Sequence, residues 1–262
     1  GEIIKGALQA ADEYGCQVVL VGQEAVVKEE LTKQGRADSK LVVIQNATEV
    51  IEMSDHPGVS VKKKKDASIV VATKLLRQGE CDALVSAGST GAAVAAALFG
   101  LGRIKGIERP SIATTIPNIK GATVLLDSGA KVDAKPEQMV QGAIMGSIFA
   151  ELILGIDNPR VGLLNIGEEE TKGNEQALAT YPLLKAEKNI NFIGNVEGRD
   201  INAGTVDVVV CDGFVGNVVL KTLEGLALAI MTLLKGTVFN TGLTTKLGAL
   251  LMKPALTKLF KK

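Results

Sequence analysis

V-V-V-C-D-G-F-V-G-N, residues 208–217, runs from an apolar segment into an aspartate and two glycines, and a helical pattern follows. A strand that is buried on both faces of a parallel sheet needs no polar side chain along its length. The polar residues after such a strand lie at its carboxyl end, where open α/β sheets bind their ligands. The stretch therefore predicts a strand, a turn and a helix, with Asp212 and Asn217 beside a ligand.

Four other stretches share this layout of an apolar strand, a glycine-bearing turn and a helix. They are residues 16–24, 82–94, 122–130 and 160–170, with shorter strand patterns at 41–44 and 190–194. Helical patterns lie between them, for example at 68–79 and 136–155. Strands that alternate with helices predict an α/β fold with a doubly wound, mainly parallel sheet and helices on both faces.

The composition fits this fold class and excludes several kinds of protein. Aromatic residues make up 3% of the 262 residues and Trp is absent, so Val, Ile, Leu and Ala must form the core. Lys plus Arg and Asp plus Glu number 29 each, so no overall positive charge favours nucleic acid. The three cysteines are far apart and there is one histidine. This pattern favours reduced thiols over a disulfide or zinc framework.

The two ends of the chain carry weaker signals. The first residues form an amphipathic helix pattern without an export signal. Because the chain begins without Met and inside that pattern, we expect further residues upstream, including a first strand. The uncharged run 225–234 is shorter than the roughly 20 residues of a membrane-spanning helix, so we expect no span.

Residues 235–262 carry six lysines and no acid. We therefore expect an α/β catalytic domain over 1–234 and a basic amphipathic helical hairpin over 235–262, with a bend at Pro254. Such a hairpin lies on anionic lipid or packs in a dimer, and the sequence leaves both open. The apolar residues expected to make the membrane contact are Leu247, Leu250, Leu251, Leu256 and Phe260.

The glycine turns at the predicted strand ends suggest an anion site. Glycines allow backbone N–H groups to approach a phosphate closely, as in the turns at 86–91 and 127–129. No G-x-x-x-x-G-K-[ST] motif is present, which argues against a P-loop ATP site. We expect these turns to converge on one edge of the sheet.

Several polar residues have a functional and a structural interpretation. Asp127 and Asp212 orient a donor or bind Mg²⁺, or they cap a helix or turn. Glu168–Glu170 open a helix, where the dipole favours negative charge, or they hold a metal. His56 is a general base or an ordinary turn residue. Cys211 is an acyl-accepting nucleophile or inert packing.

Longer motifs follow one another along almost the whole chain. They include V-S-A-G-S-T-G-A, G-R-I-K-G-I-E-R-P, L-L-D-S-G-A-K-V-D-A-K-P-E, R-V-G-L-L-N-I-G-E-E-E-T-K-G-N-E, F-I-G-N-V-E-G-R-D and V-V-V-C-D-G-F-V-G-N. In this order they resemble the PlsX-type phosphate acyltransferases of bacterial phospholipid synthesis. The chain departs from the family in lacking its opening D-A-M-G-G-D turn and its closing G-G-A-P-L-L-G-type segment. It also has Ser89 where the family usually carries Asn.

The resemblance implies a soluble, homodimeric enzyme with a fold like the isocitrate and isopropylmalate dehydrogenases. With the basic C-terminal hairpin on a lipid surface, it would be cytoplasmic and attached peripherally to the membrane. It implies transfer of a fatty acyl group from acyl carrier protein to inorganic phosphate, giving acyl phosphate for a downstream membrane acyltransferase. Thioester and acyl phosphate are both activated, so we expect no ATP or other cofactor, and we assign no metal.

This reaction suggests roles for the polar residues. The protein must hold two reactants and stabilise an oxyanion. One preorganised hydrogen-bond donor to such an oxyanion lowers the activation free energy by about 3–4 kcal/mol. The phosphate-binding candidates are Ser86, Gly88, Ser89, Thr90, Gly91, Ser128 and Gly129, with Lys64 and Lys65 for charge neutralisation. The catalytic candidates, which orient the substrates, are Asp212, Asn217, Asn165, Asn195 and Arg199. The acidic carrier protein is expected to dock on Arg103, Lys105 and Arg109, or on the lysines at 62–65.

Two other functions stay open on the sequence alone. An NAD-dependent oxidoreductase shares the implied fold, although no clear cofactor fingerprint is present. A non-catalytic membrane or carrier-protein scaffold would use the glycine turns only as architecture. NADH formation would identify the first, and phosphate-dependent loss of acyl-carrier thioester would exclude the second.

Overall fold

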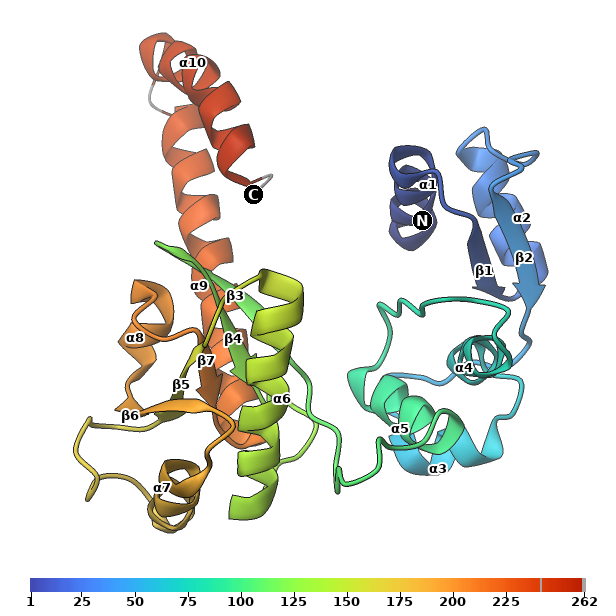
Figure 1. The fold of residues 1–262 in the computed structure, drawn as a ribbon. Helices are drawn as coiled ribbons and strands as arrows, with labels where there is room; N and C mark the ends of the chain where they lie inside the picture. The colour runs from blue at the N-terminus through green and yellow to red at the C-terminus, as the bar shows by residue number, and fades with distance from the viewer. Residues whose placement is uncertain (241, 261–262) are drawn as a thin grey trace. The chain divides into compact units, whose positions relative to one another are not determined.

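The computed structural model describes residues 1–240 and 242–260, without the side chains at 238–240, 243, 246, 253 and 255–260. The chain forms two compact units, Gly1–Pro110 and Ser111–Lys262 (Figure 1). The division that we expected near residue 235 is not where the two units meet, because helix α9 (Gly213–Asn240) crosses that position without a break.

The first unit contains a parallel strand pair and five helices. Its elements are α1 (Glu2–Tyr14), β1 (Val18–Gly22), α2 (Glu24–Lys33), β2 (Val42–Asn46), α3 (Pro57–Lys63), α4 (Ser68–Gln78) and α5 (Thr90–Gly100). Apolar side chains of α1 and α2 pack against the β1–β2 pair around Leu20. A second cluster, around Val61, Ala92 and Ala96, holds α3, α4 and α5 together.

The second unit is built on a five-stranded sheet in the order β3-β4-β7-β5-β6. Its elements are β3 (Thr114–Asn118), β4 (Gly121–Leu126), α6 (Pro136–Leu154), β5 (Arg160–Leu164), α7 (Glu175–Ala186), β6 (Asn191–Val196), α8 (Gly198–Ala203), β7 (Val208–Val210), α9 and α10 (Leu243–Phe260). Only β3 runs antiparallel to its neighbour. The prediction of an α/β fold with a mainly parallel sheet is confirmed.

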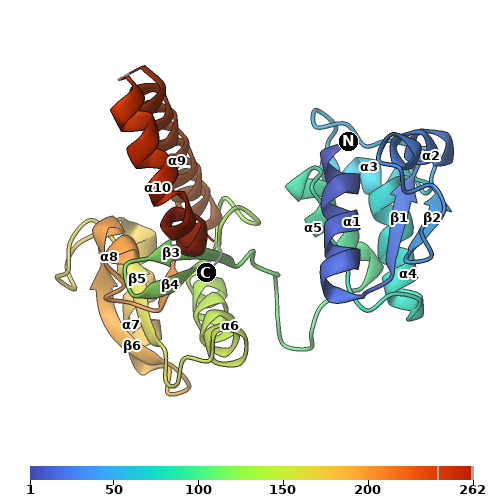
Figure 2. The same cartoon turned by 90° about the horizontal axis from the view of Figure 1, so that it is seen from above.

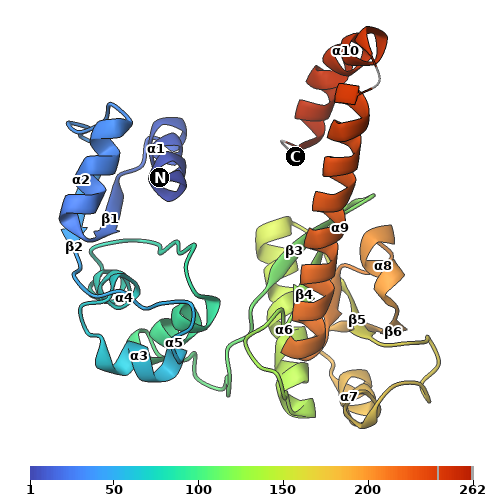
Figure 3. The same cartoon turned by 180° about the vertical axis from the view of Figure 1, so that it is seen from behind.

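Both faces of this sheet are covered by helices. Val208 and Val210 face α6 and α7, while Val209 faces α8 and α9, and all three are at most 1% exposed. Figure 3 shows α9 in front of the strands, on the side opposite to that of α6. The V-V-V run therefore needs no polar residue, because neither of its faces meets water.

The C-terminal helices differ from the expected hairpin. α9 and α10 pack side by side (Figure 2), and the chain turns between them near Gly242, whose φ is +93°. Pro254 lies inside α10 and does not end it. Proline removes one backbone donor, but its fixed φ near −65° is that of a helix, so a helix can continue through it. Pro182 lies inside α7 in the same way.

Two local predictions are wrong, and one strand was missed. Residues 82–86 form no strand in the described chain, and Val85 is 96% exposed. Glu168–Glu170 do not open a helix: they lie in a loop, and α7 begins only after Asn174, whose side chain accepts a hydrogen bond from the Ala177 N–H. Strand β3 was not predicted, since T-T-I-P-N carries a proline and no apolar run.

α9 also overturns the expectation that no segment is long enough to span a membrane. Its segment Gly213–Thr237 is long and apolar enough by length and composition, with mean hydropathy 1.6 and no buried residue in its most apolar window. The charges at Glu224 and Lys235 had ended the uncharged run. In the folded helix Lys221 Nζ and Glu224 Oε2 form an ion pair of 2.8 Å.

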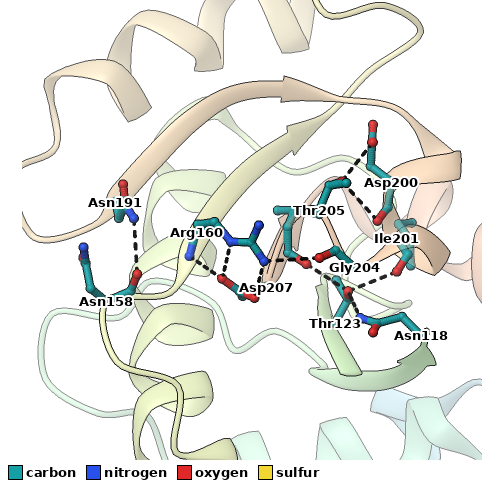
Figure 4. Close-up of polar contacts among 11 residues, drawn as sticks. Asn118, Thr123, Asn158, Arg160, Asn191, Asp200, Ile201, Gly204, Thr205 and Asp207 are labelled. Carbon is teal, nitrogen blue, oxygen red and sulfur yellow. Dashed lines mark hydrogen bonds and ion pairs between the residues drawn. The ribbon is translucent and has the colours of Figure 1, made fainter. Parts of the chain in front are cut away.

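At the amino-terminal edge of the sheet, a group of polar side chains forms hydrogen bonds with one another and with nearby backbone carbonyls (Figure 4). The Arg160 guanidinium donates two hydrogen bonds of 2.9 Å to the two carboxylate oxygens of Asp207. The Thr123 hydroxyl lies 3.0 Å from the carbonyl oxygen of Val206 and accepts from Asn118. Because these groups satisfy one another, this edge is structural.

Candidate active site

The other edge of the same sheet gathers most of the predicted catalytic residues. The register places Leu126 beside Val210, Val210 beside Leu163, and Leu163 beside Asn195. The four parallel strands therefore end at one level, as the sequence predicted for this part of the chain. Adjacent strands lie about 4.8 Å apart, so the ends of β4 and β6 are separated by about 14 Å.

Asp127, which directly follows β4, organises the turn after that strand. Its side chain is nearly buried, and its two oxygens accept hydrogen bonds from the backbone N–H groups of Ile112, Gly129, Ala130 and Lys131. The distances are 2.9–3.3 Å. Of the two interpretations of Asp127, the geometry supports the turn cap.

Asp212 plays the same part after β7. Its Oδ1 accepts from the N–H groups of Phe214 and Val215 at 2.9 and 3.0 Å, which caps the first turn of α9. A Cβ at Gly213 would stand 2.3 Å from the Lys131 carbonyl oxygen. The glycine that follows Asp212 therefore lets α9 begin directly against the Asp127 turn.

Ser128 and Gly129 lie in this turn, but their N–H groups are already paired. Ser128 N–H donates to the Ile112 carbonyl at 3.0 Å, and Gly129 N–H donates to Asp127. The Ser128 hydroxyl lies 2.6 Å from the Thr114 hydroxyl. The expectation that these two amides are available to phosphate is therefore not met in this structure. Sequence reasoning missed Thr114 because it missed β3.

Asn217 is the free polar group of this cluster. It lies one helical turn after Gly213 and is exposed, and its side chain makes no hydrogen bond within the described residues. Its Cγ would stand 3.6 Å from a Cβ at Gly129, so its amide lies directly over the Asp127 turn. An amide in this position is available to donate to a ligand.

Asn165, Asn195 and Arg199 hold the loop 165–174. Asn165 Nδ2 donates to the Lys172 carbonyl and Asn195 Nδ2 to the Glu169 carbonyl, at 2.9 and 2.8 Å. Arg199 pairs with Glu168 at 3.4 Å and with Glu197 at 3.1 Å. Asn195 is 7% exposed and its Oδ1 has no partner. These three residues shape the loop, and Asn195 Oδ1 is a buried oxygen without a hydrogen-bond partner among the described residues.

The far side of this loop is fixed by Glu170. Its Oε1 accepts from Lys185 at 2.7 Å and from the Tyr181 hydroxyl at 3.0 Å. The hydrogen bond from Lys185, aided by that from Tyr181, lowers the pKa of Glu170 below its ordinary value. Glu168 and Glu170 therefore pair the loop with Arg199 of α8 and Lys185 of α7, rather than opening a helix.

The turn Ser86–Gly91 belongs to the first unit. Ser86 Oγ accepts from the Gly88 N–H and Ser89 Oγ from the Ala92 N–H, each at 3.3 Å. Ser89 thus caps α5. The N–H groups of Thr90 and Gly91 lie in the exposed first turn, where a helix leaves its donors without intrahelical partners. This turn is the part of the chain that best fits the predicted phosphate-binding role.

The remaining charged candidates of the first unit have different surroundings. Lys64 donates to Asp55 at 2.7 Å and to the Val50 carbonyl at 2.6 Å, whereas Lys65 is exposed and unpaired among the described residues. His56 stands at the N-cap position of α3 and makes no side-chain cap bond. Lys64 therefore binds groups of the protein itself, and of the two lysines Lys65 is the one available to bind an anion.

The carrier-docking candidates Arg103, Lys105 and Arg109 lie on the irregular segment 101–110. All three are exposed, and Arg103 donates to the carbonyl oxygen of Glu108. The segment therefore mixes three cations with an acid and has no regular backbone to fix their spacing.

Cys211 lies between the two aspartates and is 4% exposed. Burial, followed by the charges of Asp212 and Asp127, raises the pKa of its thiol well above the ordinary value. A thiol held protonated is a poor nucleophile, so the packing interpretation of Cys211 is the better one. No group of three or more His, Cys, Asp or Glu residues that could hold a metal occurs among the residues that the structure describes.

Sequence reasoning also missed a recess of about 540 Å³ at the carboxyl ends of β1 and β2. Its lining residues are Gln23, Glu24, Ala25, Lys28, Asn46 and Thr48. Asn46 Oδ1 accepts from the Glu24 N–H at 3.0 Å. The only signal in the sequence was that Gly22 and Asn46 end strand patterns.

Comparison with known proteins gives a consistent result. A family model described as "fatty acid synthesis protein" matches residues 1–262. A phosphate acyltransferase of Desulfitobacterium hafniense (strain Y51) is 60% identical over 261 residues, which cover 99% of this chain and 77% of the relative. A phosphate acyltransferase of Aquifex aeolicus is 51% identical, over 100% of this chain and 77% of the relative.

Solved structures share the fold at low sequence identity. A phosphotransacetylase from Streptococcus pyogenes superposes with a TM-score of 0.65 and 19% identity, covering 86% of this chain and 78% of its own. The EutD phosphotransacetylase from Staphylococcus aureus superposes with a TM-score of 0.63 and 17% identity, covering the same shares of the two chains. At these identities the likeness shows the α/β fold alone.

Proposed function

The chain belongs to the fatty acid synthesis protein family, and from that premise we propose that it takes its acyl group from acyl carrier protein. It is an acyltransferase of phospholipid biosynthesis that transfers an acyl group to phosphate. The observation that carries this conclusion is the 60% identity over 99% of the chain to a phosphate acyltransferase. The resemblance seen in the sequence motifs is confirmed. Membership in this family favours the acyltransferase over the oxidoreductase and the non-catalytic scaffold.

The reaction needs positioning more than it needs an acid or base. A phosphate oxygen attacks the thioester carbonyl carbon, the C–S bond breaks, and the leaving thiolate takes up a proton to give thiol and acyl phosphate. Phosphate is already anionic at neutral pH, so the paired and buried state of Asp127 and Cys211 is no obstacle. The main tasks left to the protein are to align the two reactants and to stabilise the carbonyl oxyanion.

The free donors suggest which residues perform these tasks. The first-turn amides of Thr90 and Gly91 fit phosphate, because a helix N-terminus combines free N–H groups with a favourable dipole. Asn217 fits a substrate oxygen because its amide is exposed and unpaired over the Asp127 turn. Asp212 caps the first turn of α9 through Oδ1, and its carboxylate also orients a substrate group in this proposal.

The family resemblance also suggests features that lie beyond the reaction. We propose a cytoplasmic homodimer, a fold of the isocitrate and isopropylmalate dehydrogenase type, and delivery of acyl phosphate to a downstream membrane acyltransferase. These proposals rest on the sequence motifs, and gel filtration with light scattering tests the dimer directly.

We also propose that the α9–α10 pair attaches the enzyme peripherally to a membrane surface. Val215, Val219 and Leu223 pack on the sheet, so the first turns of α9 belong to the globular unit. The remainder, residues 224–240, is about 25 Å long, shorter than the about 30 Å hydrocarbon core. Apolar side chains on the pair are exposed, including Leu233, Leu247, Leu250 and Leu251 at 60–74%. Packing in the dimer is the alternative that the same exposure supports.

A thioester assay with phosphate as the sole acceptor tests the donor. Acyl-[acyl carrier protein] should lose its thioester only when phosphate is present, and hydroxylamine should trap an equal amount of acyl product as hydroxamate. Loss of thioester that does not depend on phosphate would contradict the proposal.

A further inference from the structure

A basic recess on the first unit contains Lys65, and its other residues have no role in the reaction described above. It has a volume of about 150 Å³ and lies among α3, α4 and α5. Its lining residues are Val61, Lys62, Lys65, Val70, Thr73, Lys74, Arg77, Ala96, Phe99 and Gly100. Four of these are cations and none is an acid.

The four cations have no ion-pair partner among the residues that the structure describes. Lys64, their neighbour, pairs with Asp55, but Lys62, Lys65, Lys74 and Arg77 are exposed and form no ion pair there. Lys62 Nζ lies 4.4 Å from the centre of the Phe99 ring, a contact that leaves its charge available. Such a group of like charges raises the local positive potential and attracts an acidic partner.

The recess has a firm apolar floor. A Cβ at Gly100 would stand 2.4 Å from Thr73 Cγ2, so α4 and α5 touch at the bottom. Val61 and Ala96 are buried below the cations, while Phe99 remains 47% exposed beside them. Exposed aromatic side chains are enriched at protein-binding surfaces, and charges around them orient a partner of opposite sign.

Size and spacing favour a protein over a small molecule. Sites for small ligands usually enclose about 300–1,000 Å³, at least twice this volume. Lys74 and Arg77 are three positions apart on α4 and therefore share one face. A partner helix with acids one turn apart matches that spacing, since one turn rises about 5.4 Å.

We propose that Lys62, Lys65, Lys74 and Arg77, with Phe99, form the docking surface for an acidic helix of the acyl carrier protein. This inference rests on the proposed donor and replaces the segment 101–110 as the main docking site. It gives Lys62 and Lys65 of the 62–65 run a place on a defined surface, and it adds Lys74, Arg77 and Phe99, which the sequence did not single out.

The test compares two substrates in one set of variants. Lys74→Glu/Arg77→Glu should raise the KM for acyl-[acyl carrier protein] at least about tenfold at low salt. A tenfold change corresponds to about 1.4 kcal/mol of binding free energy. It should leave kcat/KM for an uncharged acyl-pantetheine thioester, and the KM for phosphate, unchanged. Phe99→Ala should raise the carrier KM without altering its salt dependence. The charge-matched control Lys40→Glu/Lys188→Glu, on exposed surfaces elsewhere, should behave as wild type.

The outcomes separate this inference from the proposed function. If wild type makes no acyl phosphate from the carrier thioester but turns over acyl-pantetheine, the proposed donor is wrong. If wild type uses the carrier and Lys74→Glu/Arg77→Glu does not change its KM, the docking surface is wrong and the donor stands. The docking surface is also wrong if only Lys105→Glu/Arg109→Glu raises the KM for acyl-[acyl carrier protein]. It is wrong as well if Lys74→Glu/Arg77→Glu weakens only the binding of phosphate or only the binding of phosphatidylglycerol vesicles.

Discussion

A Cβ atom at Gly216 would stand 2.0 Å from the carbonyl oxygen of Asp127. The first turn of α9 and the turn after β4 are therefore in direct contact, and each is held by its own buried aspartate. Asp127 binds four backbone N–H groups and Asp212 binds two. Asn217 owes its position over Gly129 to this contact.

Gly216→Ala should disrupt this arrangement. An added methyl group at 2.0 Å from an oxygen forces the two turns apart, and overpacking of this kind costs about 1–3 kcal/mol. We expect a lower midpoint of thermal unfolding together with a loss of acyl-phosphate formation that exceeds the loss of folded protein. Calorimetry and the hydroxamate assay measure the two effects.

Gly225→Ala in the same helix is the matched control. No atom lies within 4 Å of a Cβ at that position, so the substitution should stabilise the protein by about 0.5–1 kcal/mol and leave turnover unchanged. Equal effects of the two substitutions would contradict the argument from close approach.

Asp212→Ala and Asp212→Ser separate the two interpretations of this aspartate. Serine caps a helix nearly as well as aspartate, whereas alanine costs about 1 kcal/mol. If Asp212 also acts on the substrates, both variants lose turnover while only the alanine variant loses stability. If turnover simply follows stability in urea unfolding, Asp212 is a cap alone. We expect the first result.

The Arg160–Asp207 pair should contribute to stability in a pH-dependent way. Hydrogen bonds from Arg160 hold the pKa of Asp207 below its ordinary value of 3.8. A lowered pKa contributes stability that is fully present above 3.8 and is lost as the pH falls through the folded value. Arg160→Met should therefore lower the free energy of unfolding by about 1–3 kcal/mol at pH 7. The difference from wild type should be constant down to about pH 5 and shrink below about pH 4. A difference that grows in acid would contradict this assignment.

Most strands could be predicted because both faces of the second sheet are buried. V-V-V before Cys211 and V-L-L before Asp127 are apolar without alternation, and the structure shows why, since helices cover both sides. Pairing was not predictable from local pattern. Residues 82–86 have a strand-like sequence but no partner strand, whereas β3 has a proline and still pairs with β4 along its whole length.

The candidate site was predictable at the level of strand ends and less so at the level of hydrogen bonds. The register brings the ends of β4, β7, β5 and β6 to one level, as expected. The sequence did not reveal that Asn165 and Asn195 hold a loop, or that Ser128 and Gly129 donate to Ile112 and Asp127. Glu169 is distant in sequence from Asn195, and Ile112 lies on the unpredicted segment before β3. The local bonds from Asn165 to Lys172 and from Gly129 to Asp127 depend on turn geometry that the sequence pattern does not specify.

Asn195→Ala should loosen the loop 165–174 without unfolding the sheet. The substitution removes the 2.8 Å hydrogen bond to Glu169, and a lost buried bond costs about 1–2 kcal/mol of local opening free energy. Hydrogen exchange of residues 166–173 should speed up by about 5- to 30-fold, with the core of β5 and β7 unchanged. Arg199→Ala, which removes only exposed ion pairs, should change exchange by less than about fivefold. A larger effect of Arg199→Ala would assign the loop's stability to its charges.

The exposed apolar residues of α10 give the last prediction. Leu247→Asp/Leu250→Asp/Leu251→Asp should abolish flotation with phosphatidylglycerol vesicles, because each buried leucine contributes about 1.5–3 kcal/mol and each introduced acid repels the lipid. The matched control Ile148→Asp/Leu152→Asp/Ile153→Asp, on exposed positions of α6, should still float. Light scattering on both variants decides the alternative: a monomeric α10 variant that still floats would place these leucines in the dimer contact, because lipid binding would then not depend on them.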